Sequence, residues 1–185
     1  MSIKLIFDLD YTLYSNNEVN DKTETTFYKS FKKKHLLNHL LHQVPYKKYI
    51  FSNGNKLHVD DVIKKMKLKS FFFNTATSDE YKGDLKPNIN SYNYVIKKFK
   101  IKPEDTIVFF EDSLANLQIA KKYFNWITIY INNKDSFSGK NKCSFVDFTF
   151  TTIEDAVYFL SQNNFFKNKN NLKLINHRYN KSQFF

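Results

Sequence analysis

The N-terminal segment from Lys4 to Tyr14 reads KLIFDLDYTLY. It begins with an apolar run of a length suited to one buried strand, and the run ends at Asp8 and Asp10. Residues i and i+2 of an extended chain point to the same side, so these two carboxylates are predicted to face one small volume. Because two carboxylates in one place repel each other, we expect a hard divalent cation such as Mg²⁺ to hold them. Thr12 adds a hydroxyl close by.

A D-x-D pattern has other interpretations. It occurs often by chance, and it then marks a turn or a solvated loop. A calcium loop of the EF-hand type requires a glycine and a distant glutamate, but this chain has Leu13 and Val19 at those positions. Metal-dependent glycosyltransferases also use D-x-D, so this segment alone leaves chemistry on phosphate as one of several alternatives.

The composition indicates one folded domain. The chain has 185 residues, of which 42% are hydrophobic and 18% aromatic, enough for a full core. The net charge of +11 is typical of proteins with an acidic partner or substrate. Lysine and asparagine are plentiful throughout, together with isoleucine and phenylalanine, as expected from an AT-rich genome. Nucleic-acid binding is therefore possible but not favoured.

The single cysteine, Cys143, excludes an internal disulfide and fits a reducing compartment, so we expect a cytoplasmic protein. Asp8 and Asp10 interrupt the N-terminal apolar run, which argues against a signal peptide. No segment is apolar over the length that a membrane span requires.

Apolar runs alternate with segments of helical periodicity along the chain. Strands are predicted at 3–7, 46–51, 71–73, 106–110, 127–131 and 148–150, and helices at 23–43, 57–67, 89–99, 114–124 and 153–160. Polar loops are predicted at 15–21, 75–84 and 136–142, and 163–185 is an asparagine- and lysine-rich tail without acidic residues. This alternation indicates an α/β fold with a mainly parallel sheet covered on both faces.

Polar residues follow several of these strands. Asp8 and Asp10 follow the first, Ser52 the second and Asp112 the fourth, whereas Lys86 stands at a loop-to-helix entry. Ligands of such sheets bind beyond the carboxyl ends of the strands, near the point where the strand order reverses. We therefore expect these side chains to meet at one site. His35, His39 and His42 lie at helical spacing without an acidic partner, and we interpret them as surface residues.

The sequence resembles the haloacid dehalogenase superfamily. Four of its motifs occur in order, and they read IFDLDYT from Ile6, IFSN from Ile50, KP from Lys86 and FFEDS from Phe109. Within the superfamily the chain is most similar to the pyrimidine 5′-nucleotidase-like branch, over roughly residues 3–160. The resemblance implies a Rossmannoid three-layer sandwich and a phosphatase domain at 1–162, with the tail at 163–185 outside it.

The resemblance also implies roles for individual residues. Asp8 would attack phosphorus, and Asp10 would protonate the leaving oxygen and then activate water. Mg²⁺ would be held by Asp8, Asp112 and the backbone carbonyl of Asp10, with Glu111 acting through water. Phosphate oxygens would be bound by Ser52, by the backbone of Asn53 and by Thr12, and Lys86 would offset charge and steady the nucleophile.

One departure from the branch concerns the cap that supplies most of its substrate selectivity. Relatives carry a helical cap between the first two motifs, but here the intervening segment leaves room only for a vestigial cap or flap at 15–29. We therefore expect an open site, which a second subunit could cover.

The predicted function is a Mg²⁺-dependent phosphatase acting on a phosphorylated small molecule, with nucleotides among the candidates. Two alternatives remain, a phosphatase of a polynucleotide or protein and a catalytically weak binding or scaffold protein that uses its basic surface. No membrane partner is expected.

Overall fold

The computed structural model describes residues 2–18, 23–132 and 143–162. The loop predicted at 136–142 and the tail predicted at 163–185 lie outside the described residues. Within them, six strands form one parallel sheet in the order β3-β2-β1-β4-β5-β6. These strands are β1 (Ile3–Phe7), β2 (Lys47–Phe51), β3 (Phe72–Ala76), β4 (Thr106–Glu111), β5 (Ile127–Ile131) and β6 (Phe148–Phe150). The predicted α/β class is confirmed.

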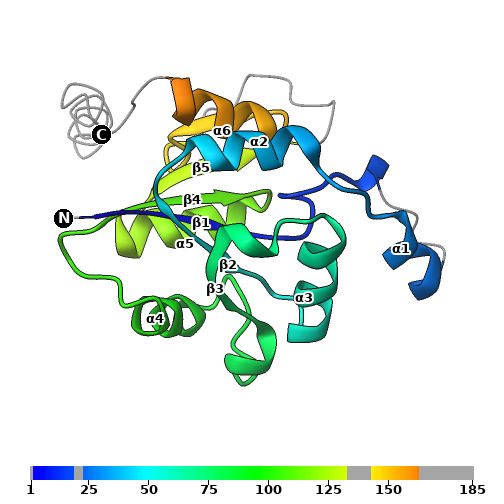
Figure 1. Cartoon of the computed structure of the whole chain (residues 1–185). Coiled ribbons are helices and arrows are strands. Elements are labelled where there is room, and N and C mark those ends of the chain that lie inside the picture. Colours follow the sequence, from blue (N-terminus) through cyan, green and yellow to red (C-terminus); the bar gives the residue numbers. More distant parts are fainter. Residues whose placement is uncertain (1, 19–22, 133–142, 163–185) are drawn as a thin grey trace.

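Helices cover both faces of the sheet (Figure 1). One face carries α2 (His35–Gln43), α3 (Lys56–Lys65) and α6 (Ile153–Gln162), and the other carries α4 (Ile89–Lys98) and α5 (Leu114–Phe124). Leu5 and Phe7 of β1 belong to the first core cluster and Ile6 belongs to the second, because successive side chains of a strand point to opposite faces. The remaining helical segments are α1 (Glu24–Ser30) and the short 3₁₀ turns η1 (Asn16–Glu18), η2 (Lys69–Phe71) and η3 (Ser78–Glu80).

The strand order brings together the polar residues that follow the strands. The chain adds β2 and β3 on one side of β1 and then returns to add β4 on the other side. The crevice between the carboxyl ends of β1 and β4 is therefore the point where the strand order reverses. Asp8 follows β1 at this point, and its backbone N–H donates to the carbonyl of Phe110 at 2.9 Å.

The single helix predicted at 23–43 is wrong. The structure has α1 and α2, and Phe31 between them is extended (φ −64°, ψ 129°). Phe31 packs edge-on against Tyr14 with ring centroids 4.8 Å apart, whereas Leu37 and Leu41 of α2 lie in the core cluster that also contains α6. Tyr14 belongs to that same cluster and Phe31 packs against it, but α1 packs against α3 whereas α2 packs against α6, so one straight helix cannot serve both. Periodicity within the segment does not reveal that difference.

The third strand was also misplaced. It was predicted at 71–73, but it runs from Phe72 to Ala76 and takes the first two residues of the predicted 75–84 loop. Thr75 and Ala76 pair with Ile50 and Phe51 of β2. Pairing with a central strand outweighs the polar appearance of this segment.

The other predicted elements of the described chain are confirmed to within one or two residues at most ends. His35, His39 and His42 are exposed, as predicted. Among the described residues, no helix combines the length and the apolar character needed to cross a membrane.

Candidate active site

The centre of the candidate site is a buried ion pair between Asp8 and Lys86. Nζ of Lys86 lies 2.6 Å from Oδ1 of Asp8, 2.8 Å from Oε2 of Glu111 and 2.8 Å from the carbonyl of Phe51, to which it also donates. Burial by itself lowers the pKa of Lys86, but the two carboxylates outweigh it and raise that pKa, so the residue remains cationic.

Burial has the opposite effect on the acidic residues. It raises the pKa of Asp8 to about 7, with a further contribution from Glu111, although Lys86 opposes the shift. The pKa of Glu111 and the pKa of Asp112 are raised as well, each mainly by burial. A cation close to these groups would reverse the shifts, because it favours the ionised carboxylates.

The acidic residues fit a divalent cation. One oxygen each from Asp8, Glu111 and Asp112 lie within 4.8 Å of one another. Oδ2 of Asp8 is buried and has no hydrogen-bond partner among the described residues. An orphaned, buried carboxylate oxygen beside two further carboxylates is a donor set that suits Mg²⁺.

Both carboxylate oxygens of Glu111 accept hydrogen bonds from protein groups. Oε2 of Glu111 accepts from Lys86, and its Oε1 accepts from the backbone N–H groups of Asp112 and Ser113, both at 3.1 Å. Its carboxylate is thus occupied by protein donors, which suits the predicted contact with metal through water better than direct ligation.

Asp10 is held by two residues that the sequence did not single out. Its Oδ1 accepts hydrogen bonds from the hydroxyl of Tyr14 and from Nε2 of His58, the latter at 2.6 Å. Burial alone raises the pKa of Asp10, but the bonds from His58 and Tyr14 outweigh it, and the pKa is lowered overall. His58 shows the converse, because its bond to Asp10 outweighs burial and raises the imidazole pKa.

The turn after β2 lies against Asp10. Ser52 is fully buried, and its Oγ accepts from the backbone N–H of Gly54 at 2.9 Å, which leaves the hydroxyl hydrogen free to serve a phosphate oxygen. A methyl group at Gly54 would lie 2.7 Å from Cδ2 of His58, 3.2 Å from Oγ of Ser52 and 3.6 Å from Oδ2 of Asp10. Glycine therefore allows these three side chains to meet.

The side chain of Asn53 points elsewhere. Its amide group donates to the carbonyl of Lys86 at 3.0 Å and accepts from the N–H of Lys86 at 2.9 Å. It thereby fixes the segment that carries Lys86. The predicted phosphate contact of Asn53 involves its backbone N–H, which this arrangement leaves available.

Thr12 is buried in the turn that follows β1, and its Oγ1 has no hydrogen-bond partner among the described residues. Tyr11, which precedes it, has a positive φ of 61°, so the chain turns sharply directly after Asp10. None of the described contacts joins the Thr12 hydroxyl to the other predicted site residues.

Sequence reasoning missed His58, Tyr14 and Tyr28. His58 stands in the first turn of α3, where its backbone N–H donates to the Asn55 side chain, and its Nδ1 lies 2.9 Å from the hydroxyl of Tyr28. The one available signal is an ionisable residue in the first turn of a helix that follows a strand end. No spacing rule links it to Asp10, which lies 48 residues away.

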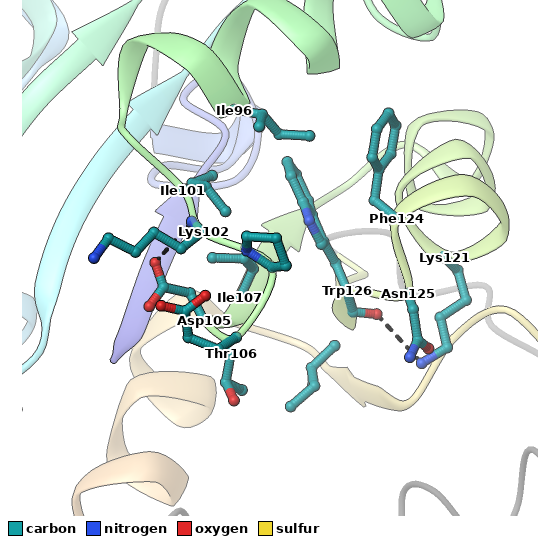
Figure 2. Close-up of a pocket in the computed structure, with 13 residues that line it drawn as sticks. Ile96, Ile101, Lys102, Asp105, Thr106, Ile107, Lys121, Phe124, Asn125 and Trp126 are labelled. Carbon is teal, nitrogen blue, oxygen red and sulfur yellow. Dashed lines mark hydrogen bonds between the residues drawn. The ribbon is translucent and has the colours of Figure 1, made fainter. Parts of the chain in front are cut away.

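A separate cavity lies at the amino ends of the strands, opposite the candidate site. This space of about 540 Å³ opens where β4 and β5 begin. Figure 2 shows the residues that line it. Phe124 and Trp126 line it with ring centroids 5.7 Å apart, and Asp105 and Lys102 lie on its other side. None of the predicted site residues lines this cavity.

Comparison with solved structures shows the same fold in several enzymes. An L-2-haloacid dehalogenase from Xanthobacter autotrophicus aligns over 88% of this chain and 100% of its own, with a TM-score of 0.63 and 14% identity. A putative beta-phosphoglucomutase from Thermotoga maritima gives the same coverage, score and identity. A HAD phosphatase from Thermococcus onnurineus aligns over 86% of this chain and 98% of its own, with a TM-score of 0.58 and 18% identity. At such identities the likeness concerns the fold alone.

No curated protein matches the chain. The family model of haloacid dehalogenase-like hydrolases matches residues 15–124, which is more than half of the 185 residues. By this match, the chain belongs to the haloacid dehalogenase-like hydrolase family.

Proposed function

We propose that this hydrolase is a Mg²⁺-dependent phosphatase that cleaves phosphate monoesters through an aspartyl-phosphate on Asp8. The observation that carries the proposal is the placement of a second aspartate, Asp10, whose carboxylate is held by His58 and Tyr14 beside the Ser52 turn. Within the superfamily that the sequence resembles, a second aspartate at this position favours phosphate transfer over dehalogenation.

The two aspartates are suited to different tasks. Asp8 is buried and oriented by Lys86, as a nucleophile must be, whereas the Asp10 side chain is 29% exposed and can exchange protons with substrate and water. The donors on Asp10 stabilise its carboxylate, which is the form that accepts a proton from water in the second half of the reaction.

The proposed reaction has two steps. A carboxylate oxygen of Asp8 bonds to phosphorus, the bond to the leaving oxygen breaks, and that oxygen takes a proton from Asp10. Water then gives a proton back to Asp10 and bonds to phosphorus, the bond to Asp8 breaks, and phosphate departs. Ser52 and the backbone N–H of Asn53 bind phosphate oxygens, and Lys86 keeps Asp8 in place.

The Mg²⁺ ion would be bound by Asp8, Asp112 and the backbone carbonyl of Asp10, with Glu111 acting through water. When bound, it neutralises charge on phosphate and on the clustered carboxylates, so that one anion can approach another. Oδ2 of Asp8, which has no hydrogen-bond partner within the described part of the chain, is the observation in this structure that supports the ion.

The substrate class follows from the proposed branch and the short cap. The similarity of the motifs to the pyrimidine 5′-nucleotidase-like branch puts nucleotides first, and a reduced cap at 15–29 would also admit larger phosphate esters. A second subunit covering the site, a domain at 1–162 and a reducing, cytoplasmic location are parts of the same proposal.

An assay with p-nitrophenyl phosphate tests the proposal. The wild type should hydrolyse this ester with Mg²⁺ and stop on addition of EDTA. Asp8→Asn should abolish turnover with an unchanged circular dichroism spectrum, because an amide does not attack phosphorus. Asp10→Asn should lose about a hundredfold or more in kcat, the usual contribution of general acid–base catalysis, because Asp10 takes the proton from water in the second step. Glu104 is an exposed residue just before β4, far from the site, and Glu104→Gln should match the wild type in turnover. An active Asp8→Asn variant would exclude the mechanism.

A screen of nucleotides, sugar phosphates and phosphopeptides with the same variants would then rank the substrates. Mg²⁺ binding without turnover of any of these esters would favour the binding or scaffold alternative.

A further inference from the structure

Asp10 is held from one side only. Both of its donors, Tyr14 and His58, contact the same oxygen, Oδ1. Among the described residues no donor contacts Oδ2, which lies on the side of Gly54, 3.6 Å from where a Cβ would stand. The two donors thus fix the carboxylate so that its other oxygen is presented to the space above the Ser52 turn.

Both donors are packed by the same short helix, α1. Its Phe27 stacks on the His58 ring with centroids 5.9 Å apart and an interplanar angle of 24°. Its Tyr28 places a hydroxyl 2.9 Å from Nδ1 of His58. Phe31, which follows α1, packs edge-on against Tyr14 at 4.8 Å.

A hydrogen-bonded chain therefore runs from α1 to the proposed proton-transfer group, through Tyr28, His58 and Asp10. Because one nitrogen of a neutral imidazole donates while the other accepts, a Tyr28 hydroxyl that donates to Nδ1 places the proton on Nε2, facing Asp10. That tautomer of neutral His58 can hold the carboxylate, and so can protonated His58, in which both ring nitrogens donate.

We propose that His58 is a positioning residue for Asp10 and that α1, through Tyr28 and Phe27, together with Phe31 directly after it, forms the clamp that holds both donors of Asp10 in place. This inference rests on the proposed function. It gives the segment between β1 and α2, where relatives of the branch carry their cap, a role in proton transfer in addition to any contact with substrate.

The distinguishing measurement is the dependence of kcat/KM on the leaving group. This ratio reports the step that phosphorylates Asp8 and is independent of the later hydrolysis. A p-nitrophenolate departs without a proton, whereas an alkoxide needs one from Asp10. His58→Phe removes the donor but keeps an aromatic ring, and it should lose at least about tenfold more kcat/KM on an alkyl phosphate than on p-nitrophenyl phosphate.

Conservative variants separate positioning from folding. The amide nitrogen of His58→Gln can occupy the place of Nε2, so this variant should recover most of the loss on the alkyl ester. Tyr28→Phe should show the same selective loss on a smaller scale.

Gly54→Ala should resemble His58→Phe, because the added methyl would lie 2.7 Å from Cδ2 of His58 and push the ring away. His35→Leu, at an exposed histidine of α2, is the matched control and should leave both esters unaffected.

A second readout does not depend on activity. The readout compares crystal structures of the wild type, His58→Phe and Tyr28→Phe. In His58→Phe the Asp10 carboxylate should be rotated away from Tyr14 or split between conformers. If Asp10 keeps its orientation in His58→Phe, or if this variant slows both esters equally, the inference is overturned. Failure of the proposed function would look different, since the wild type would then hydrolyse neither ester while the Asp10 conformer still responded to His58→Phe.

Discussion

Nζ of Lys86 lies 2.6 Å from Oδ1 of Asp8, and both side chains are almost completely buried. Lys86 comes 78 residues after Asp8 in the chain, and it also contacts Glu111, so one ammonium group links the turn after β1 with the end of β4. This arrangement compensates two buried carboxylates with one cation and leaves a net negative charge for a metal to neutralise.

Replacement of Lys86 should therefore destabilise the fold. Lys86→Met leaves Asp8 and Glu111 without their cation, and loss of one partner from a buried pair costs about 3–5 kcal/mol. Urea denaturation should show this loss, and Mg²⁺ should restore part of it because the ion compensates the same carboxylates. Lys97→Met, at an exposed lysine of α4, should change stability by less than about 0.5 kcal/mol. A Lys86→Met variant as stable as the wild type would contradict the charge balance described here.

The two acidic residues at the end of β4, Glu111 and Asp112, should differ in their effect on metal binding. Asp112→Ala removes a proposed direct ligand and should weaken Mg²⁺ binding more than Glu111→Ala, because the Glu111 carboxylate is occupied by Lys86 and two backbone N–H groups. Calorimetric titration with Mg²⁺ ranks the two variants. The reverse order would mean that Glu111 is the direct ligand.

Asp105 should make stability depend on pH. Burial raises the pKa of this carboxyl, but hydrogen bonds from Lys4, Lys102 and Ser2 outweigh it and hold the pKa well below its usual range. A group whose folded pKa is lowered contributes stability above its unfolded pKa, and this contribution is lost as the pH falls through the folded pKa.

Asp105→Asn should accordingly lower the free energy of unfolding by about 1–3 kcal/mol at pH 7. Its difference from the wild type should shrink below about pH 4, the unfolded pKa of aspartate. Urea titrations at pH 7 and pH 3 measure both values. Glu104→Gln is the exposed neighbouring control, and an equal deficit of Asp105→Asn at the two pH values would refute the electrostatic origin.

The basic charge of the chain can be tested through its tail. If the site serves a polynucleotide end, oligonucleotide binding should fall steeply with salt, and deletion of 163–185 should make the log–log slope shallower. The deletion removes Lys167, Lys169, Lys173, Arg178 and Lys181. We expect instead weak binding at physiological salt and unchanged turnover of small esters, because these charges are interleaved with asparagine rather than clustered with aromatic residues. Tight, tail-dependent binding would overturn this expectation.

The sequence by itself determined the class of fold and the position of the chemistry. Strand and helix periodicities predicted the parallel sheet, because each buried element must present apolar residues at its own spacing. The rule that ligands bind at the carboxyl ends of parallel strands then predicted that Asp8, Ser52, Lys86 and Asp112 lie at one site. The structure places Lys86 against Asp8 and brings Asp112 within reach of the same point.

Only the tertiary structure decided where the chain breaks between α1 and α2 and which side chains surround Asp10. Phe31 contacts Tyr14, and His58 contacts both Asp10 and Tyr28, although 48 and 30 residues separate His58 from these partners. Periodicity describes which face of an element is apolar, but it carries no information about which distant surface that face will meet. The two donors of Asp10, together with the Tyr28 that contacts His58, come from three separate segments, and their meeting depends on packing that no local pattern encodes.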